Sequence, residues 1–186
     1  MDYTIRETKH AFGFLFVGVS IAVAAAAILS EIVFVSKSPY YYYVIVWIGS
    51  FGITFGATMA KLGKIIPLIR SRMKNSLHWS AGAKLLNGLC WAVPFATIAL
   101  FPSFLQYLIL LGIGLGNLST FILMKKYSGL TNNEQLIVGA ISLLAIPFAF
   151  EIDTALFVTS QDIAVMLSRI LISISYAAGG LYALFS

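Results

Sequence analysis

Residues 11–35 read AFGFLFVGVSIAVAAAAILSEIVFV, and Glu31 is the only charged residue among them. About twenty apolar residues are enough to cross the hydrocarbon core of a bilayer as an α-helix, which satisfies its backbone polar groups internally. The run is too long for the apolar core of a signal peptide. It therefore predicts a transmembrane helix that is retained in the protein.

Five further apolar segments follow the first. The chain of 186 residues is 60% hydrophobic and only 10% charged, and its mean hydropathy is +0.93. A soluble domain of this size could not bury so much apolar surface, so the surplus must face lipid. The sequence predicts an all-α fold, a bundle of six transmembrane helices in one domain over residues 1–186. The other spans are expected at 41–60, 83–101, 103–124, 135–155 and 162–185, with a basic loop at 61–84.

Basic residues gather in alternate connections between these spans. Arg6 and Lys9 precede the first span, six lysines and arginines lie in the 61–84 loop, and Lys125 and Lys126 separate the fourth span from the fifth. Cytoplasmic loops are enriched in lysine and arginine, so we expect both termini in the cytoplasm and a multi-pass protein of the cell membrane. This distribution accounts for the net charge of +5 without nucleic acid as a partner.

The basic loop is predicted to contact anionic lipid headgroups at the cytoplasmic face. Its apolar residues recur at helical spacing between the basic ones, which is typical of a helix lying in the membrane interface. Docking of a soluble protein on this loop is the alternative. Headgroup contacts are expected from Lys61, Lys64, Arg70, Arg72 and Lys74.

Four ionisable residues are predicted to lie near the outer surface: Arg169, Glu31, Glu151 and Asp153. Arg169 and Glu31 lie within their spans, whereas Glu151 and Asp153 either end the fifth span or, if it continues through residues 155–158, lie inside it. Arg169 lies roughly 10 Å below that surface at a rise of about 1.5 Å per residue. An unpaired arginine at this depth is costly, so we expect it to pair with one of the three carboxylates. Three interpretations are consistent with this pattern: a structural ion pair that fixes helix register, a solute or proton site that opens outward, and residues that are simply hydrated at the membrane interface.

A second polar layer is predicted nearer the cytoplasm, around Asn87 and Asn117 in the third and fourth spans. Amides in lipid seek partners on other helices, and such bonds contribute about 0.6–2 kcal/mol. We expect an interhelical hydrogen bond here, with the lining of a polar cavity as the alternative. Pro94 and Pro147 lie about half-way along the third and fifth spans, where each removes a backbone N–H and predicts a helix kink. Such kinks either serve packing or border a transport site.

Small residues at four-residue spacing predict close helix packing in three spans. The pattern fits packing within the chain, and equally fits contact with a partner's transmembrane helix or with a second copy in a homo-oligomer. The residues are Ala22, Ala26 and Ser30 in the first span, Gly52 and Gly56 in the second, and Gly112 and Gly116 in the fourth.

No catalytic motif is recognisable, and we expect that the protein is not an enzyme. Both histidines, His10 and His78, are expected near the cytoplasmic face, and Cys90 is the single cysteine. A haem held between facing histidines, an intramolecular disulfide and a cysteine metal site are therefore unsupported, and no metal or cofactor is expected.

Two functional classes follow from these features. The first is a membrane transport protein, a channel or a membrane-embedded solute-binding component, with an outward-facing polar site around Arg169. In its six spans and its Ala22-x-x-x-Ala26 motif the chain distantly resembles the substrate-binding components of energy-coupling-factor vitamin transporters, and the resemblance implies a substrate-binding role. The second class is a structural or assembly subunit of a membrane complex that packs through its small-residue faces.

Overall fold

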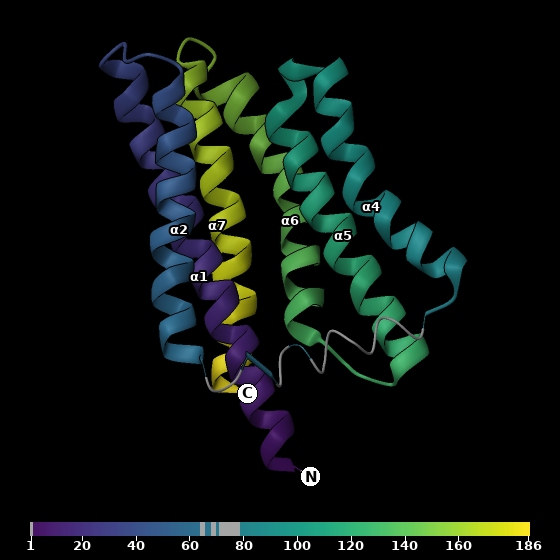
Figure 1. Cartoon of the computed structure of the whole chain (residues 1–186). Coiled ribbons are helices and arrows are strands. Elements are labelled where there is room, and N and C mark those ends of the chain that lie inside the picture. The colour runs from purple at the N-terminus through teal and green to yellow at the C-terminus, as the bar shows by residue number, and fades with distance from the viewer. Residues whose placement is uncertain (1, 64–65, 68–69, 71–78) are drawn as a thin grey trace.

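The computed structural model describes residues 2–63, 66, 67, 70 and 79–186, and the elements in these ranges are helical (Figure 1). Six helices of this described part are long and apolar enough to cross a membrane. The all-α, six-span prediction is therefore confirmed, and the chain is a multi-pass membrane protein in contact with lipid. The helices are α1 (Asp2–Val35), α2 (Tyr41–Leu62), α4 (Ala81–Leu100), α5 (Leu105–Ser128), α6 (Asn133–Glu151) and α7 (Gln161–Phe185).

Local sequence signals explain several of the helix ends. Ser80 caps the start of α4, where its hydroxyl accepts a hydrogen bond from the backbone N–H of Ala83 at 3.3 Å. Pro102 opens a short 3₁₀ turn (η2, Pro102–Phe104) that reverses the chain into α5. Gly129 ends α5 in the left-handed region with φ 63°, a conformation that glycine adopts without the steric cost of a side chain.

The fifth span does not end with its α-helix. After Glu151 the chain continues as a π-helical turn (η3, Ile152–Leu156), in which the N–H of Phe157 donates to the carbonyl of Ile152. The membrane-spanning segment extends to Leu156. Glu151 is thus the last residue of the α-helix, and Asp153 lies inside the π turn. Single π turns are rare and occur frequently at functional sites.

The six helices form two groups that meet along α6 and α7. The first helix packs against the last, α1 on α7, and α2 covers α1. In the second group α5 lies between α4 and α6, and α6 packs against α7. Both termini lie at one end of the bundle, and the α1–α2 and α6–α7 connections lie at the opposite end (Figure 1). We call this second end the connection end.

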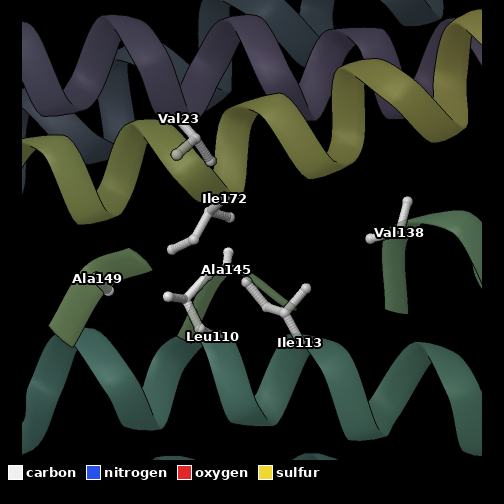
Figure 2. Packing of buried hydrophobic residues seen from close by; sticks show 7 residues of the cluster. All are labelled: Val23, Leu110, Ile113, Val138, Ala145, Ala149 and Ile172. Carbon is white, nitrogen blue, oxygen red and sulfur yellow. The ribbon is translucent and has the colours of Figure 1, made fainter. Parts of the chain in front are cut away.

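The packed interior lies where α1, α5, α6 and α7 meet. In Figure 2 the side chain of Ile172 on α7 points toward Leu110 of α5 and Ala145 of α6. Leu110 and Val138 have no exposed surface. Small side chains on α6 let its neighbours approach, which suits helix association in lipid, where tight packing replaces the hydrophobic effect. The cluster contains Val23, Leu110, Ile113, Val138, Ala145, Ala149 and Ile172.

The three predicted small-residue faces behave differently. Ala22, Ala26 and Ser30 are buried on α1, and a Cβ added to Gly112 or Gly116 of α5 would meet the ring of Phe95 or Trp91 of α4. These two faces therefore pack within the chain. A Cβ added to either glycine of α2, in contrast, would meet nothing within 4 Å. The α2 face is left open to the surroundings. The two α2 positions are Gly52 and Gly56.

Both predicted kink positions lie inside helices. Pro94 lies within α4 and Pro147 within α6, and each helix continues past its proline. Pro94 is buried, whereas Pro147 is exposed. The Pro147 ring therefore faces away from the packed interior, and it lines neither of the hollows described below.

Candidate functional site

Arg169 occupies a half-buried position on α7, toward the connection end. Its guanidinium lies over the ring of Trp47 on α2, 5.6 Å from the ring centroid. A cation over an indole face is attracted by the ring quadrupole, and guanidinium groups favour this arrangement. The contact fixes the direction of the arginine side chain between α2 and α7.

A pocket of about 330 Å³ opens beside this guanidinium. Its wall is built from α1, α2 and α7, and it combines charged groups of both signs with apolar side chains. We call it the Arg169 pocket. It is lined by Ala27, Ser30, Glu31, Phe34, Tyr43, Gln161, Asp162, Val165, Met166 and Arg169.

Two carboxylates share the pocket with Arg169. Glu31 of α1 and Asp162 of α7 lie within hydrogen-bonding reach of each other, and Glu31 also interacts electrostatically with Arg169. Glu31 was one of the three carboxylates that the sequence offered as a partner of Arg169, and Asp162, which the structure adds to the pocket, was not among them. The signal for Asp162 was present, because it precedes Arg169 by two helical turns and so lies on the same face of α7.

Ser30 contributes a polar group that the fold leaves unused. The residue is 3% exposed and lines the Arg169 pocket, yet its hydroxyl has no hydrogen-bond partner. Helical serines commonly donate to the carbonyl four residues earlier, as Ser168 does to Ala164. A buried hydroxyl without a partner costs free energy, and a ligand in the pocket could remove that cost.

A second hollow of about 420 Å³ adjoins the first. Tyr43 and Arg169 line both hollows, so the two meet at the arginine. The second hollow is mainly aromatic and apolar, and its other lining residues are Tyr40, Val44, Trp47 and Ile48. Part of the tyrosine run at the start of α2 therefore borders a hollow next to a cation.

Glu151 and Asp153 are not brought to Arg169. Glu151 is exposed at the end of α6. Asp153 instead faces α5, where one carboxylate oxygen accepts hydrogen bonds from the Gln106 amide at 3.1 Å and from the Tyr107 hydroxyl. Its other oxygen is buried without a hydrogen-bond partner. Sequence periodicity could not separate these two carboxylates from Glu31, because the π turn that redirects Asp153 has no recognisable sequence pattern.

Removal of the Tyr107 hydroxyl is expected to destabilise the connection end of α5 and α6. Hydrogen bonds to charged groups contribute about 1.5–3 kcal/mol, and Tyr107 is only half-buried, so the Tyr107→Phe variant should lose about 1–2 kcal/mol. Thermal unfolding in detergent measures the loss. Tyr41→Phe, at a position 56% exposed, is the control and should melt like the parent. Equal melting of all three proteins would contradict a stabilising role for the bond.

The inner polar residues lie in two separate places. Asn87 of α4 accepts hydrogen bonds from Ser119 at 2.7 Å and Thr120 at 2.9 Å, both on α5. Asn117 donates to the carbonyl of Ile113 in its own helix, and Tyr176 of α7 is a further hydrogen-bonding neighbour. Each amide thus has hydrogen-bonding neighbours on another helix, and the two amides do not bond to each other.

The predicted headgroup residues fall largely outside the described part of the chain. Lys64, Arg72 and Lys74 lie outside it, as does the side chain of Lys61. Arg70 is described and is exposed.

The Arg169 pocket can recognise charge, because groups of both signs line it. Within the described residues no group of three or more histidine, cysteine, aspartate or glutamate side chains is placed to hold a metal ion. The pocket holds two carboxylates, one guanidinium, an unused hydroxyl and an aromatic neighbour. These groups suit reversible binding of a small charged molecule.

Comparison with protein-family models, with curated proteins and with solved structures gives no match.

Proposed function

We propose that this chain is a membrane transport protein, a channel or a membrane-embedded solute-binding component of the cell membrane, and that the Arg169 pocket is its solute site. The proposal includes cytoplasmic termini, as the basic connections favour. The connection end then faces outward and the pocket opens to the outside. Anionic headgroups would contact the basic loop at the opposite face.

One observation carries this proposal: a hollow of about 330 Å³ reaches a half-buried arginine at the connection end. An ion pair that only fixed helix register would be sealed by packing, because exposure to water weakens it. The Ser30 hydroxyl, which has no hydrogen-bond partner, also favours a solute site. We propose binding and not catalysis, because the sequence contains no recognisable catalytic motif.

A thermal-shift screen of the purified protein against a library of small solutes tests the proposal. A ligand at about 100 times its Kd stabilises by about 2.7 kcal/mol, which corresponds to a rise in melting temperature of roughly 5–10 °C for a chain of this size. We expect at least one solute to give such a shift. Arg169→Ala should keep its own cooperative melting and lose the shift. A screen with no shift, or a shift that survives Arg169→Ala, would contradict the proposal.

A structural or assembly subunit is the second candidate, and the open face of α2 favours it. Gly52 and Gly56 lie on this face with free space around them, and Ile45, Ile48 and Ile53 are exposed on the same helix. Such a face suits a partner helix or a second copy of the chain. This role predicts that Arg169→Ala reduces the amount of folded protein and that no solute shifts the melting temperature.

A further inference from the structure

The charges of the Arg169 pocket are arranged in two groups. The guanidinium of Arg169 forms the positive group, and it is held at the boundary between the two hollows by Trp47. Glu31 and Asp162 form the negative group, within hydrogen-bonding reach of each other. Both groups line the same pocket of about 330 Å³. An occupant of this pocket therefore meets both signs of charge at once.

We propose that the occupant is a small zwitterion that carries one ammonium and one carboxylate group. This assignment rests on the solute-binding role proposed above. A guanidinium binds a carboxylate through two parallel N–H donors. An ammonium has three donors and no acceptor, so it suits the neighbouring oxygens of Glu31 and Asp162. One zwitterion satisfies both groups in the same binding event.

Other classes of solute fit the pocket less well. A simple anion would pair with Arg169 but would be repelled by the two neighbouring carboxylates. A simple cation would gain the carboxylates but would lie beside the guanidinium. A neutral apolar solute would displace water from three charged side chains and would replace none of the hydrogen bonds that the water made. Its binding would therefore carry the largest desolvation cost.

The Ser30 hydroxyl provides independent support. The hydroxyl is buried and has no partner, and Ser30, the residue that carries it, lines the pocket and precedes Glu31 in sequence. A serine hydroxyl can both accept from an ammonium and donate to a carboxylate. It would complete the hydrogen bonds of either end of a zwitterion, whereas an apolar solute would leave it unsatisfied.

The pocket dimensions limit the size of the zwitterion. The volume of the pocket, about 330 Å³, is at the lower end of the range for ligand sites, about 300–1,000 Å³. Phe34, Val165 and Met166 supply apolar wall in the same pocket. The aromatic hollow begins beyond Arg169. An amino-acid-sized solute with an apolar or aromatic side group fits this combination.

Matched probes separate the charge classes. The probes are L-leucine, L-methionine and L-phenylalanine, each compared with the amine that lacks its carboxylate and with the acid that lacks its amine. Thermal shift and equilibrium binding to the purified protein are the measurements. We expect at least one of the three amino acids to bind, and its two singly charged analogues to bind about 30-fold more weakly or worse, because each leaves one charged group of the site unpaired.

Three variants locate the binding in this pocket. Glu31→Gln and Asp162→Asn each remove one carboxylate of the negative group, and each should weaken amino-acid binding about 10-fold or more. Ser30→Ala removes only the unpartnered hydroxyl, so it should melt like the parent or higher and still bind about 3–10-fold more weakly. Glu151→Gln, which changes an exposed carboxylate outside the pocket, is the matched control and should bind like the parent.

The possible failures are distinguishable. If a singly charged analogue binds as tightly as its amino acid, or if the full solute screen finds only neutral or singly charged ligands, the zwitterion assignment is overturned and the solute site stands. If no solute of any class shifts the melting temperature, both proposals fail. If the Ser30→Ala variant and the Glu31→Gln variant each bind the amino acid as tightly as the parent does, the assignment to this pocket is also overturned.

Discussion

Leucine in place of Gly180 is expected to remove most of the folded protein. A Cβ at this position of α7 would lie 2.8 Å from the backbone nitrogen of Val17 and 2.9 Å from the carbonyl oxygen of Gly13, both on α1. Backbone atoms cannot move aside as a flexible side chain does, so the first and last helices would have to separate. Overpacking typically costs 1–3 kcal/mol, and a leucine against backbone should cost more than about 3 kcal/mol. Yield of monodisperse protein and thermal unfolding in detergent measure the loss.

Gly56→Leu is the matched control for this prediction. It makes the same chemical change in another span, at a position where an added Cβ meets nothing within 4 Å. Glycine is also a weak helix former, about 1 kcal/mol worse than alanine. The control should therefore melt within a few degrees of the parent or higher. Similar losses in both variants would contradict the close α1–α7 contact as the cause.

The contrast between these two glycines shows where sequence reasoning stops. Small residues at four-residue spacing were recognisable in three spans, yet only the α1 and α5 faces pack within the chain, and the α2 face stays open. Spacing defines a helix face but says nothing of which helix covers it. Gly180, which lies close to the backbone of α1, belongs to none of the three stripes recognised in the sequence.

The architecture itself was predictable because it follows from local composition. Each span is a run of apolar residues long enough to cross lipid, and this property is visible without knowledge of the packing. The weakest boundary was the end of the fifth span, where Glu151 closes the α-helix and a π turn carries the chain on to Leu156. Hydrophobicity predicts the length of such a segment but not the change in its hydrogen-bond pattern.

The candidate site was predictable only in part for the same reason. Depth in the membrane placed Arg169 and Glu31 in one layer, and the structure places both in one pocket. Depth alone could not choose between Glu31, Glu151 and Asp153, because that choice depends on how the helices are rotated and paired. Asp162 needed only the two-turn spacing on α7, so a search of each helix face around Arg169 would have included it.

A cysteine at position 43 is expected to react with a membrane-impermeant maleimide added to intact cells. Tyr43 lines both hollows at Arg169, so its replacement would expose the thiol to whatever water fills them. The chain suits this measurement because Cys90 is its single cysteine, and Cys90→Ala supplies a background without thiols. In that background Tyr43→Cys should be labelled nearly completely, as judged by the shift in mobility on a denaturing gel.

Two further cysteine variants are the controls for this labelling. Leu110→Cys lies in the packed interior with no exposed surface and should stay unlabelled in the folded protein. Thr131→Cys is exposed in the α5–α6 connection, at the end of the bundle that carries the termini. It should react only after the cells are permeabilised, because the proposed orientation places that end in the cytoplasm. Labelling of Thr131→Cys in intact cells, with Tyr43→Cys silent, would reverse the orientation. Silence of Tyr43→Cys before and after permeabilisation would mean that the hollow is closed to water, and the solute site would then have to be abandoned.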